Sequence, residues 1–350
     1  MKPYNSTILS HQTAFKTNLT TNRLQQALSV IRKKEKNTSS FFNYEATANK
    51  WKNWTAFYSS VQGYEHLRNN LPCQDFSFAH AKSKRPIAIV CDGAGSSKAS
   101  QIGSRAVVTS LKTLFLTLEP ILYKVLDKAE GYTLKDLDAM VIRHVNEVLL
   151  DLSIEHNRPI EDFSCTLLLM VGGMINNYWL KIGDGAIVVE TFETITKTVV
   201  EENKNTSSSF LDTVRTDDRF SYVYLNKPEL VQLKEKVVEE NVFKLSYLGE
   251  NNKGGFANET FFISKKSPYQ SGFISAKNIS AFFVMSDGCE IKFVDSKDTT
   301  KIATRLSTFA EKAREGFFNS IQISKMFYST EFTANHNGDD CSLAFCSKDI

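Results

Sequence analysis

The chain has 350 residues, of which 42% are hydrophobic and 23% charged, a composition typical of a folded protein with an apolar core. This composition excludes collagen-like, mucin-like and wholly disordered chains. The 42 Lys and Arg against 39 Asp and Glu give a formal net charge of +3. Because this charge is too small for the long-range field that non-specific nucleic-acid binding needs, we expect no nucleic-acid partner.

The six cysteines are widely spaced, and no two form the Cys-x-x-Cys pair of zinc or redox sites. Cys91 and Cys346 lie in apolar runs, where a thiol behaves as a small hydrophobic group. The N-terminus lacks the apolar region of a signal peptide, and no apolar stretch reaches the ~18 residues of a membrane span. We therefore expect reduced cysteines in a soluble, cytoplasmic protein with no membrane partner.

The N-terminal segment, residues 1–50, is rich in Asn, Thr, Ser and Lys. It contains an amphipathic stretch at 24–31 that ends in a basic run at 32–36. We predict an N-terminal extension made of an accessory helix and a linker, with the basic run as a solvated helix end. The main domain is then expected to span residues 51–350.

Hydrophobic periodicity in the main domain predicts alternating groups of strands and helices. The segment at about 192–260, which follows the strand predicted at 186–191, contains a polar tract, and we interpret it as an irregular insertion. The order of elements favours an α+β, layered sandwich over a strict βαβ repeat. The predicted strands are 57–61, 75–80, 86–91, 165–171, 178–182, 186–191, 282–286 and 341–346, and the predicted helices are 97–118, 134–152 and 299–318.

One local pattern, an apolar strand followed by a small residue and Asp-Gly, occurs at Asp92, Asp184 and Asp287, and Asp339-Asp340 precedes a fourth strand. Each Asp-Gly taken alone is a hairpin turn signal. As a set, carboxylates at the ends of neighbouring buried strands repel one another unless cations neutralise them. The set therefore indicates either unrelated turns or a site for Mg²⁺ or Mn²⁺, which prefer oxygen ligands. Two such ions would support metal-assisted hydrolysis of a phosphate ester.

In order and spacing, the motifs resemble the metal-dependent serine/threonine protein phosphatases of the PP2C type, particularly their bacterial branch. The resemblance covers residues 54–347, apart from the insertion. The motifs that carry it are Gly63-Tyr64-Glu65-His66, Leu71-Pro72-Cys73-Gln74-Asp75, Asp92-Gly93-Ala94-Gly95-Ser96, Ser164-Cys165-Thr166-Leu167, Gly183-Asp184-Gly185, Ser286-Asp287-Gly288 and Gly338-Asp339-Asp340-Cys341-Ser342.

The resemblance implies a four-layer α/β/β/α sandwich, with two central antiparallel sheets and a metal centre at one end. It implies in-line attack of a metal-bound hydroxide on phosphoserine or phosphothreonine, without a phosphoenzyme intermediate. The implied substrate is a phosphorylated protein, a kinase or its target, and we expect the enzyme to be a monomer. The implied ligands are Asp75, Asp92, Asp287, Asp339 and the Gly93 carbonyl for two core ions of Mg²⁺ or Mn²⁺, and Asp184 with Asp287 for a third, weaker ion.

Three positions depart from the pattern of the family. Gln74 stands where many members have an acidic residue, and an amide contributes no charge. Ala94 stands where eukaryotic members have a histidine that can protonate the leaving group, so water or another residue would act as the acid. Asn70 occupies the spacing of the phosphate-binding arginine, which leaves His66 and Arg68 as candidate substrate-binding residues. A turn histidine and a surface arginine are the alternatives for these two positions.

Two other functions stay open at this point. The departures favour a catalytically weak member that keeps the fold as a regulatory or binding module. The retained aspartates argue against it, because a protein that binds no metal has no reason to keep carboxylates that repel one another. The second alternative is a phosphohydrolase of small phosphate esters. The insertion is either a mobile flap beside the active site or a surface loop.

Overall fold

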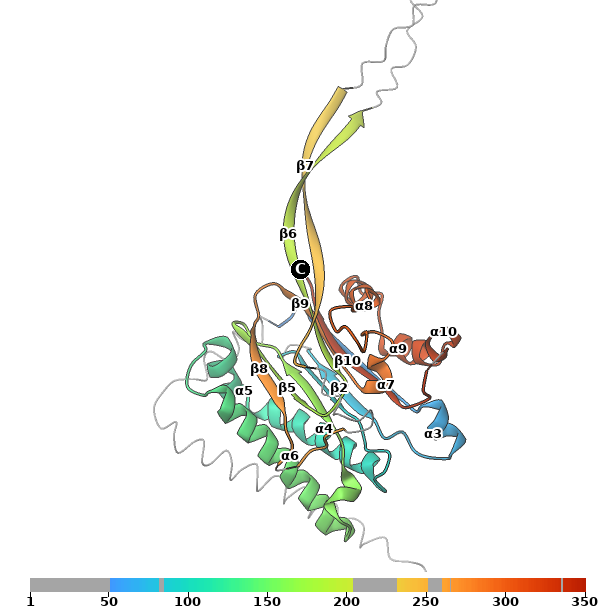
Figure 1. Ribbon diagram of the computed structural model, residues 1–350. Helices are drawn as coiled ribbons and strands as arrows, with labels where there is room; N and C mark the ends of the chain where they lie inside the picture. Colours follow the sequence, from blue (N-terminus) through green and yellow to red (C-terminus); the bar gives the residue numbers. More distant parts are fainter. Residues whose placement is uncertain (1–50, 82–84, 204–231, 251–259, 265, 335) are drawn as a thin grey trace, which may run out of the picture. The chain divides into compact units, whose positions relative to one another are not determined.

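Two antiparallel sheets form the centre of the unit that spans Trp51–Ile350 (Figure 1). The computed structural model describes residues 51–350 except 82–84, 204–231, 251–259, 265 and 335, so the predicted extension at 1–50 lies outside the described residues. Sheet A has the order β1 (Trp54–Val61), β10 (Cys341–Lys348), β9 (Ile279–Met285), β6 (Ala186–Asn203) and β7 (Gln232–Tyr247). Sheet B has the order β2 (Phe76–His80), β3 (Ile87–Cys91), β4 (Leu167–Val171), β5 (Asn176–Ile182) and β8 (Gln270–Ser275).

Helices cover the outer face of each sheet. The helices α4 (Ser100–Thr117) and α6 (Leu134–His156) pack on sheet B, and α8 (Arg305–Arg314) and α9 (Ser320–Phe327) pack on sheet A. The predicted α+β sandwich, with its four layers α/β/β/α, is therefore confirmed. The shorter helical segments are α3 (Tyr64–Arg68), α5 (Glu119–Leu122), η1 (Tyr123–Asp127), η2 (Ile160–Phe163), α7 (Asp287–Glu290) and α10 (Thr330–Thr333).

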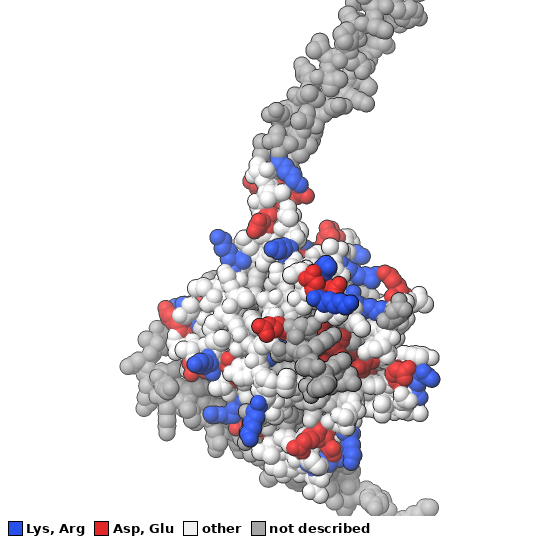
Figure 2. All heavy atoms as spheres, viewed as in Figure 1, with Lys and Arg blue, Asp and Glu red and all other residues white. Residues whose placement is uncertain are grey.

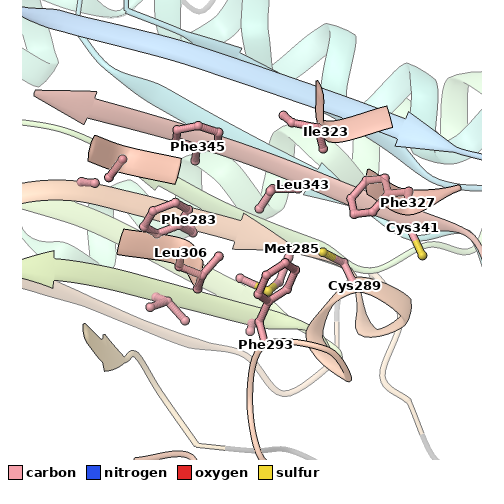
Figure 3. Packing of buried hydrophobic residues seen from close by; sticks show 14 of the residues in the cluster. Phe283, Met285, Cys289, Phe293, Leu306, Ile323, Phe327, Cys341, Leu343 and Phe345 are labelled. Carbon is pink, nitrogen blue, oxygen red and sulfur yellow. The ribbon is translucent and has the colours of Figure 1, made fainter. Parts of the chain in front are cut away.

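The alternation of side chains along the strands produces two separate hydrophobic layers. Every residue of β9 is buried, and consecutive side chains along the strand point to opposite faces of the sheet. Phe282 and Val284 pack between the two sheets. Phe283 and Met285 pack against Leu306 and other residues of the helices that cover sheet A (Figure 3). Most positions of a strand buried on both faces are apolar, which is why residues 281–285 form an unbroken hydrophobic run. The buried Ser280 instead donates to Glu190.

The two ends of α6 follow from local capping. Thr133 and Asp136 form a reciprocal capping box at the start, and Asn157 takes a left-handed conformation with φ of 50° at the end.

The prediction of one helix over 299–318 is wrong in extent. The helix α8 covers only Arg305–Arg314 of this range, and Gly316, with φ of 76°, follows its end. The separate helix α9, capped by Asn319, begins beyond the predicted range.

Within the described segments, no single helix has the length and apolar composition of a membrane span. The segment Ser100–Thr117 passes such a test only together with Glu119–Asp127, as a pair bent by 66°. Buried residues of both segments, such as Leu111 and Leu122, belong to the core of the sandwich.

The irregular structure predicted for about 192–260 is wrong for the residues that the structure describes there, whereas the interpretation of this segment as an insertion stays a prediction. The strand β7 pairs with β6 over its whole length, from Val188 opposite Tyr247 to Asn203 opposite Gln232. Because β6 pairs with β9 only as far as Thr191, the rest forms a two-stranded ribbon that extends beyond the sandwich (Figure 1). The sequence analysis missed this ribbon because the segment is rich in polar residues. A two-stranded ribbon outside the core needs no apolar face, so it lacks the hydrophobic pattern by which strands are predicted.

Basic and acidic side chains are interspersed on the face that Figure 2 shows, among the residues described there. This arrangement agrees with the formal net charge of only +3 for the whole chain.

Candidate metal centre

The predicted aspartates lie at one edge of the sandwich because of the way the strands alternate. Asp92 directly follows β3, and Asp184 lies in the turn from β5 to β6. Asp287 follows β9 after a single serine. Asp75 and Asp339 instead come just before β2 and β10, which run antiparallel to their neighbours β3 and β9. In an antiparallel sheet, the start of one strand lies beside the end of the next. Asp75 therefore lies beside Asp92 in sheet B, and both Asp184, before β6, and Asp339 lie beside Asp287 in sheet A.

Three of the carboxylates come close enough to share a cation. Carboxylate oxygens of Asp92, Asp184 and Asp287 all lie within 4.8 Å of one another. Asp75 contacts Asp92 through its side chain, and the charge of Asp339 acts on Asp287. The structure therefore brings the predicted carboxylates together, although they come from segments far apart in the sequence.

The proximity and burial of these groups raise their pKa values. Burial is the largest cause for Asp92, whose pKa lies well above its ordinary value, and the charges of Asp75 and Asp287 add to the effect. Burial also raises the pKa of Asp75. For Asp287, burial and then the charge of Asp184 raise the pKa from 3.8 to about 6. Such a cluster destabilises the folded chain at neutral pH unless a cation neutralises it.

The donor set fits a hard divalent cation. Both carboxylate oxygens of Asp75 and the amide oxygen of Gln74 are buried and lack a well-oriented hydrogen bond within the described residues. Buried oxygens without donors are the ligands that Mg²⁺ and Mn²⁺ take. The three carboxylates that converge supply only oxygen, so the residues present fit the ions that the sequence analysis predicts.

Backbone geometry constrains the position of Asp184. Gly183 and Gly185 flank Asp184 with φ of 93° and 89°, a region that side chains disfavour, and a Cβ on Gly183 would lie 2.6 Å from the Phe261 carbonyl oxygen. The Thr260 hydroxyl donates to Asp184 Oδ2 at 2.5 Å.

Two hydrogen bonds connect Asp92 to Thr166, the residue directly before β4. The Asp92 backbone N–H donates to the Thr166 hydroxyl at 3.0 Å, and the Thr166 N–H donates to the Asp92 carbonyl at 2.8 Å. The motif Ser164-Cys165-Thr166-Leu167 therefore has a structural role beside the centre. Gly93 is also constrained, since a Cβ there would lie 2.8 Å from the Gln74 carbonyl. That the Gly93 carbonyl is a ligand stays a prediction.

Asp340 is a buried carboxylate beside Asp339, and sequence reasoning gave it no role. Its carboxylate is only 2% exposed and accepts hydrogen bonds from the backbone N–H of Gly63 at 2.6 Å and of Gln74 at 2.5 Å. His66 Nδ1 lies 2.9 Å from Asp340 Oδ2, and His66 Nε2 lies 3.8 Å from Asp339 Oδ1. The structure therefore places the predicted substrate-binding histidine at the centre. The only sequence signal was a second aspartate beside the first.

Arg68, the other predicted substrate-binding residue, is not brought to the carboxylates. Its side chain is 63% exposed, and its guanidinium lies 3.2 Å from Glu65 and stacks near Tyr64. Ala94 is buried and offers a methyl group where a proton donor could stand.

A second histidine that sequence reasoning missed supports the loop before Asp339. His336 Nδ1 accepts from the Gly338 N–H at 2.9 Å, and this leaves Nε2–H to donate to the Gly288 carbonyl at 2.7 Å. The loop is thereby tied to α7, which begins with Asp287. A cavity of about 470 Å³ adjoins Asp339, and Tyr64, Leu67 and Tyr328 are among the side chains that line it.

Comparison with known proteins identifies the family. A family model described as protein phosphatase 2C matches residues 62–233 and 237–325. The chain belongs to the protein phosphatase 2C family. Serine/threonine-protein phosphatase 3 of Escherichia coli K12 is 28% identical over 145 residues, which cover 39% of this chain and 53% of the relative. The chain thus spans about half the length of this curated relative.

Two of the solved structures with a similar course of the chain are of phosphatases named PstP. The serine/threonine phosphatase PstP/Ppp of Mycobacterium tuberculosis has a TM-score of 0.49 and 11% identity, over 85% of this chain and 99% of that one. The catalytic domain of PstP in complex with two manganese ions has a TM-score of 0.46 and 13% identity, over 84% and 97%.

Proposed function

We propose that this protein is a metal-dependent phosphatase that hydrolyses phosphoserine and phosphothreonine in proteins. The observation that carries the proposal is the convergence of Asp92, Asp184 and Asp287 within 4.8 Å, in a chain of the protein phosphatase 2C family. The E. coli relative is named a serine/threonine-protein phosphatase, which supports the substrate class. We further propose that the substrate is a kinase or its target, and that the protein acts as a cytoplasmic monomer.

The residues proposed to hold Mg²⁺ or Mn²⁺ belong to two groups, the ligands of two core ions and the ligands of a third, weaker ion. Asp184, together with Asp287, would hold the third ion. When bound, such ions neutralise the carboxylates, lower the pKa of coordinated water and polarise the oxygens of the phosphoryl group. The core ligands are the side chains of Asp75, Asp92, Asp287 and Asp339 and the carbonyl of Gly93.

The protein's own side chains orient the substrate. His66 Nδ1 lies 2.9 Å from Asp340 Oδ2, and Nε2 is on the side of Asp339, where it can contact the phosphoryl group. Arg68 pairs with Glu65 at the surface, so we assign the phosphate contact to His66. Because Ala94 cannot donate a proton, the leaving serine or threonine oxygen takes its proton from water or from another side chain. The cavity beside Asp339 leaves room for residues that flank the phosphorylated one.

The test is a comparison of substrates under controlled metal conditions. Phosphate release would be measured from a phosphothreonine peptide, a nucleotide and a sugar phosphate, each with Mn²⁺ and with EDTA. We expect release that requires metal and a kcat/KM that is highest for the phosphopeptide. A preference for the nucleotide or the sugar phosphate would favour a phosphohydrolase of small esters. Absence of release from folded, Mn²⁺-loaded protein would favour the regulatory or binding module.

A further inference from the structure

A lysine side chain is buried between the two sheets, at the end that carries the carboxylates. Lys181 lies on β5 and is 0% exposed. It shares a face of the strand with Trp179, which packs in the hydrophobic layer between the sheets. Burying an ammonium group costs several kcal/mol unless hydrogen bonds and opposite charges compensate. An apolar residue would fill this position at lower cost, so the lysine calls for an explanation.

The contacts of Lys181 connect three segments of the chain. Its Nζ donates to the Gly185 carbonyl at 2.7 Å and to the Tyr247 hydroxyl at 2.8 Å, and lies 3.4 Å from the Glu250 carbonyl. Tyr247, the last residue of β7, also lies within hydrogen-bond distance of two oxygens: 3.1 Å from the Gly185 carbonyl and 3.3 Å from Glu290 Oε1. Burial, and then the charge of Glu290, raise the pKa of Tyr247 far above its ordinary value, so the hydroxyl remains a donor.

Both ends of this network adjoin proposed metal ligands. Gly185 directly follows Asp184, and its carbonyl lies within reach of both the Lys181 and the Tyr247 donors. Glu290 belongs to α7, the single helical turn that begins with Asp287, and is 5% exposed. The network therefore contacts the two segments whose carboxylates come within 4.8 Å of each other.

We propose that Lys181 and Tyr247 are positioning residues that hold the Gly183–Gly185 turn and α7 in the arrangement in which Asp184 and Asp287 share a cation. The inference rests on the proposed function. It also makes the root of the β6–β7 ribbon part of the support of the metal centre, because Tyr247 ends β7. The charge of Lys181 by itself would oppose cation binding, so the two effects of this residue on metal affinity have opposite signs.

Two variants separate positioning from charge. Tyr247→Phe removes one hydroxyl and no charge. Lys181→Met removes the ammonium group and keeps an unbranched side chain. The matched control is Tyr178→Phe, since Tyr178 is also buried on β5 and donates to a buried carboxylate, Asp138, at 2.8 Å, away from the centre.

The measurements are Mn²⁺ binding to metal-free protein by titration calorimetry, the unfolding temperature in EDTA, and the Mn²⁺ dependence of phosphate release. Loss of a group that supports a metal ligand typically weakens affinity about 10–100-fold. We expect the weakest Mn²⁺ site to lose about 10-fold or more in Tyr247→Phe and Lys181→Met, and to be unchanged in Tyr178→Phe. Saturating Mn²⁺ should restore kcat, because the variants shift metal occupancy; general damage to the fold would lower kcat at every concentration.

Unchanged Mn²⁺ isotherms in both folded variants would overturn the inference. So would tighter binding in Lys181→Met, since the charge of the lysine would then outweigh any positioning effect. If Lys181→Met does not fold, Tyr247→Phe alone decides. A wild-type protein that binds no Mn²⁺ would overturn the proposed function itself. If the wild type and both variants bind Mn²⁺ equally well, only the inference about Lys181 and Tyr247 is overturned.

Discussion

Replacing Asp287 by asparagine should stabilise the metal-free protein at neutral pH. The pKa of Asp287 rises from 3.8 to about 6 on folding, mainly through burial and then through the charge of Asp184. A carboxyl whose pKa is raised in the folded state contributes stability below pH 4, and this stability is lost as the pH rises through about 6. At 1.36 kcal/mol per pH unit, the loss is at most about 3 kcal/mol.

The assay is urea unfolding in EDTA at pH 7 and at pH 4, with Asp349→Asn, at an exposed position, as the control. We expect Asp287→Asn to exceed the wild type at pH 7 by about 1–3 kcal/mol in free energy of unfolding, and the difference to shrink at pH 4. Added Mn²⁺ should make the wild type more stable than Asp287→Asn, because Mn²⁺ binding to the folded state stabilises the wild type more than the variant. Equal stability of the two proteins at pH 7 would refute the reasoning, as would a difference that does not depend on pH.

Three further substitutions test individual contacts. His66→Ala should raise KM for a phosphothreonine peptide several-fold, whereas Arg68→Ala should leave KM within about 2-fold, because surface ion pairs contribute little; steady-state kinetics would reassign the phosphate contact if the two results were exchanged. Asp340→Asn should destabilise the fold by about 1–3 kcal/mol in denaturant unfolding, since one oxygen that accepts a backbone N–H becomes a donor, and a neutral effect would mean that these two hydrogen bonds contribute little to stability. Gly183→Ala should cost about 1–3 kcal/mol by the same assay; unchanged stability would show that the turn tolerates a side chain.

The layered α+β sandwich could be predicted from local patterns in the sequence. The pattern of aspartates alone left unrelated turns open, and the metal centre followed from the resemblance to the PP2C family. Each Asp-Gly follows a strand that is buried on both faces, so its apolar run and its end are visible in the sequence. In an antiparallel sheet the start of one strand lies beside the end of its neighbour, so Asp75, before β2, and Asp92, after β3, lie at the same edge. The short helices α9 and α10 were missed, because segments of eight and four residues carry too little periodicity.

Other features depend on partners distant in sequence and so leave no local signal. Lys181 lies in the run Trp179-Leu180-Lys181-Ile182, where a single lysine looks like an exposed position on a strand. Its burial depends on Tyr247, which is 66 residues away. Asp340 could not be distinguished from Asp339 by sequence, since the direction of each side chain is set by how the loop meets Gly63 and Gln74.

The most direct test of the account is phosphate release from a phosphothreonine peptide by the wild type and by Asp287→Asn, each with Mn²⁺, with Mg²⁺ and with EDTA. The account predicts release by the wild type with a divalent ion, none in EDTA, and at least a 100-fold loss in the variant (about two orders of magnitude) while its circular dichroism spectrum stays unchanged. Release that persists in EDTA, or an Asp287→Asn protein as active as the wild type, would contradict the assignment of the metal centre.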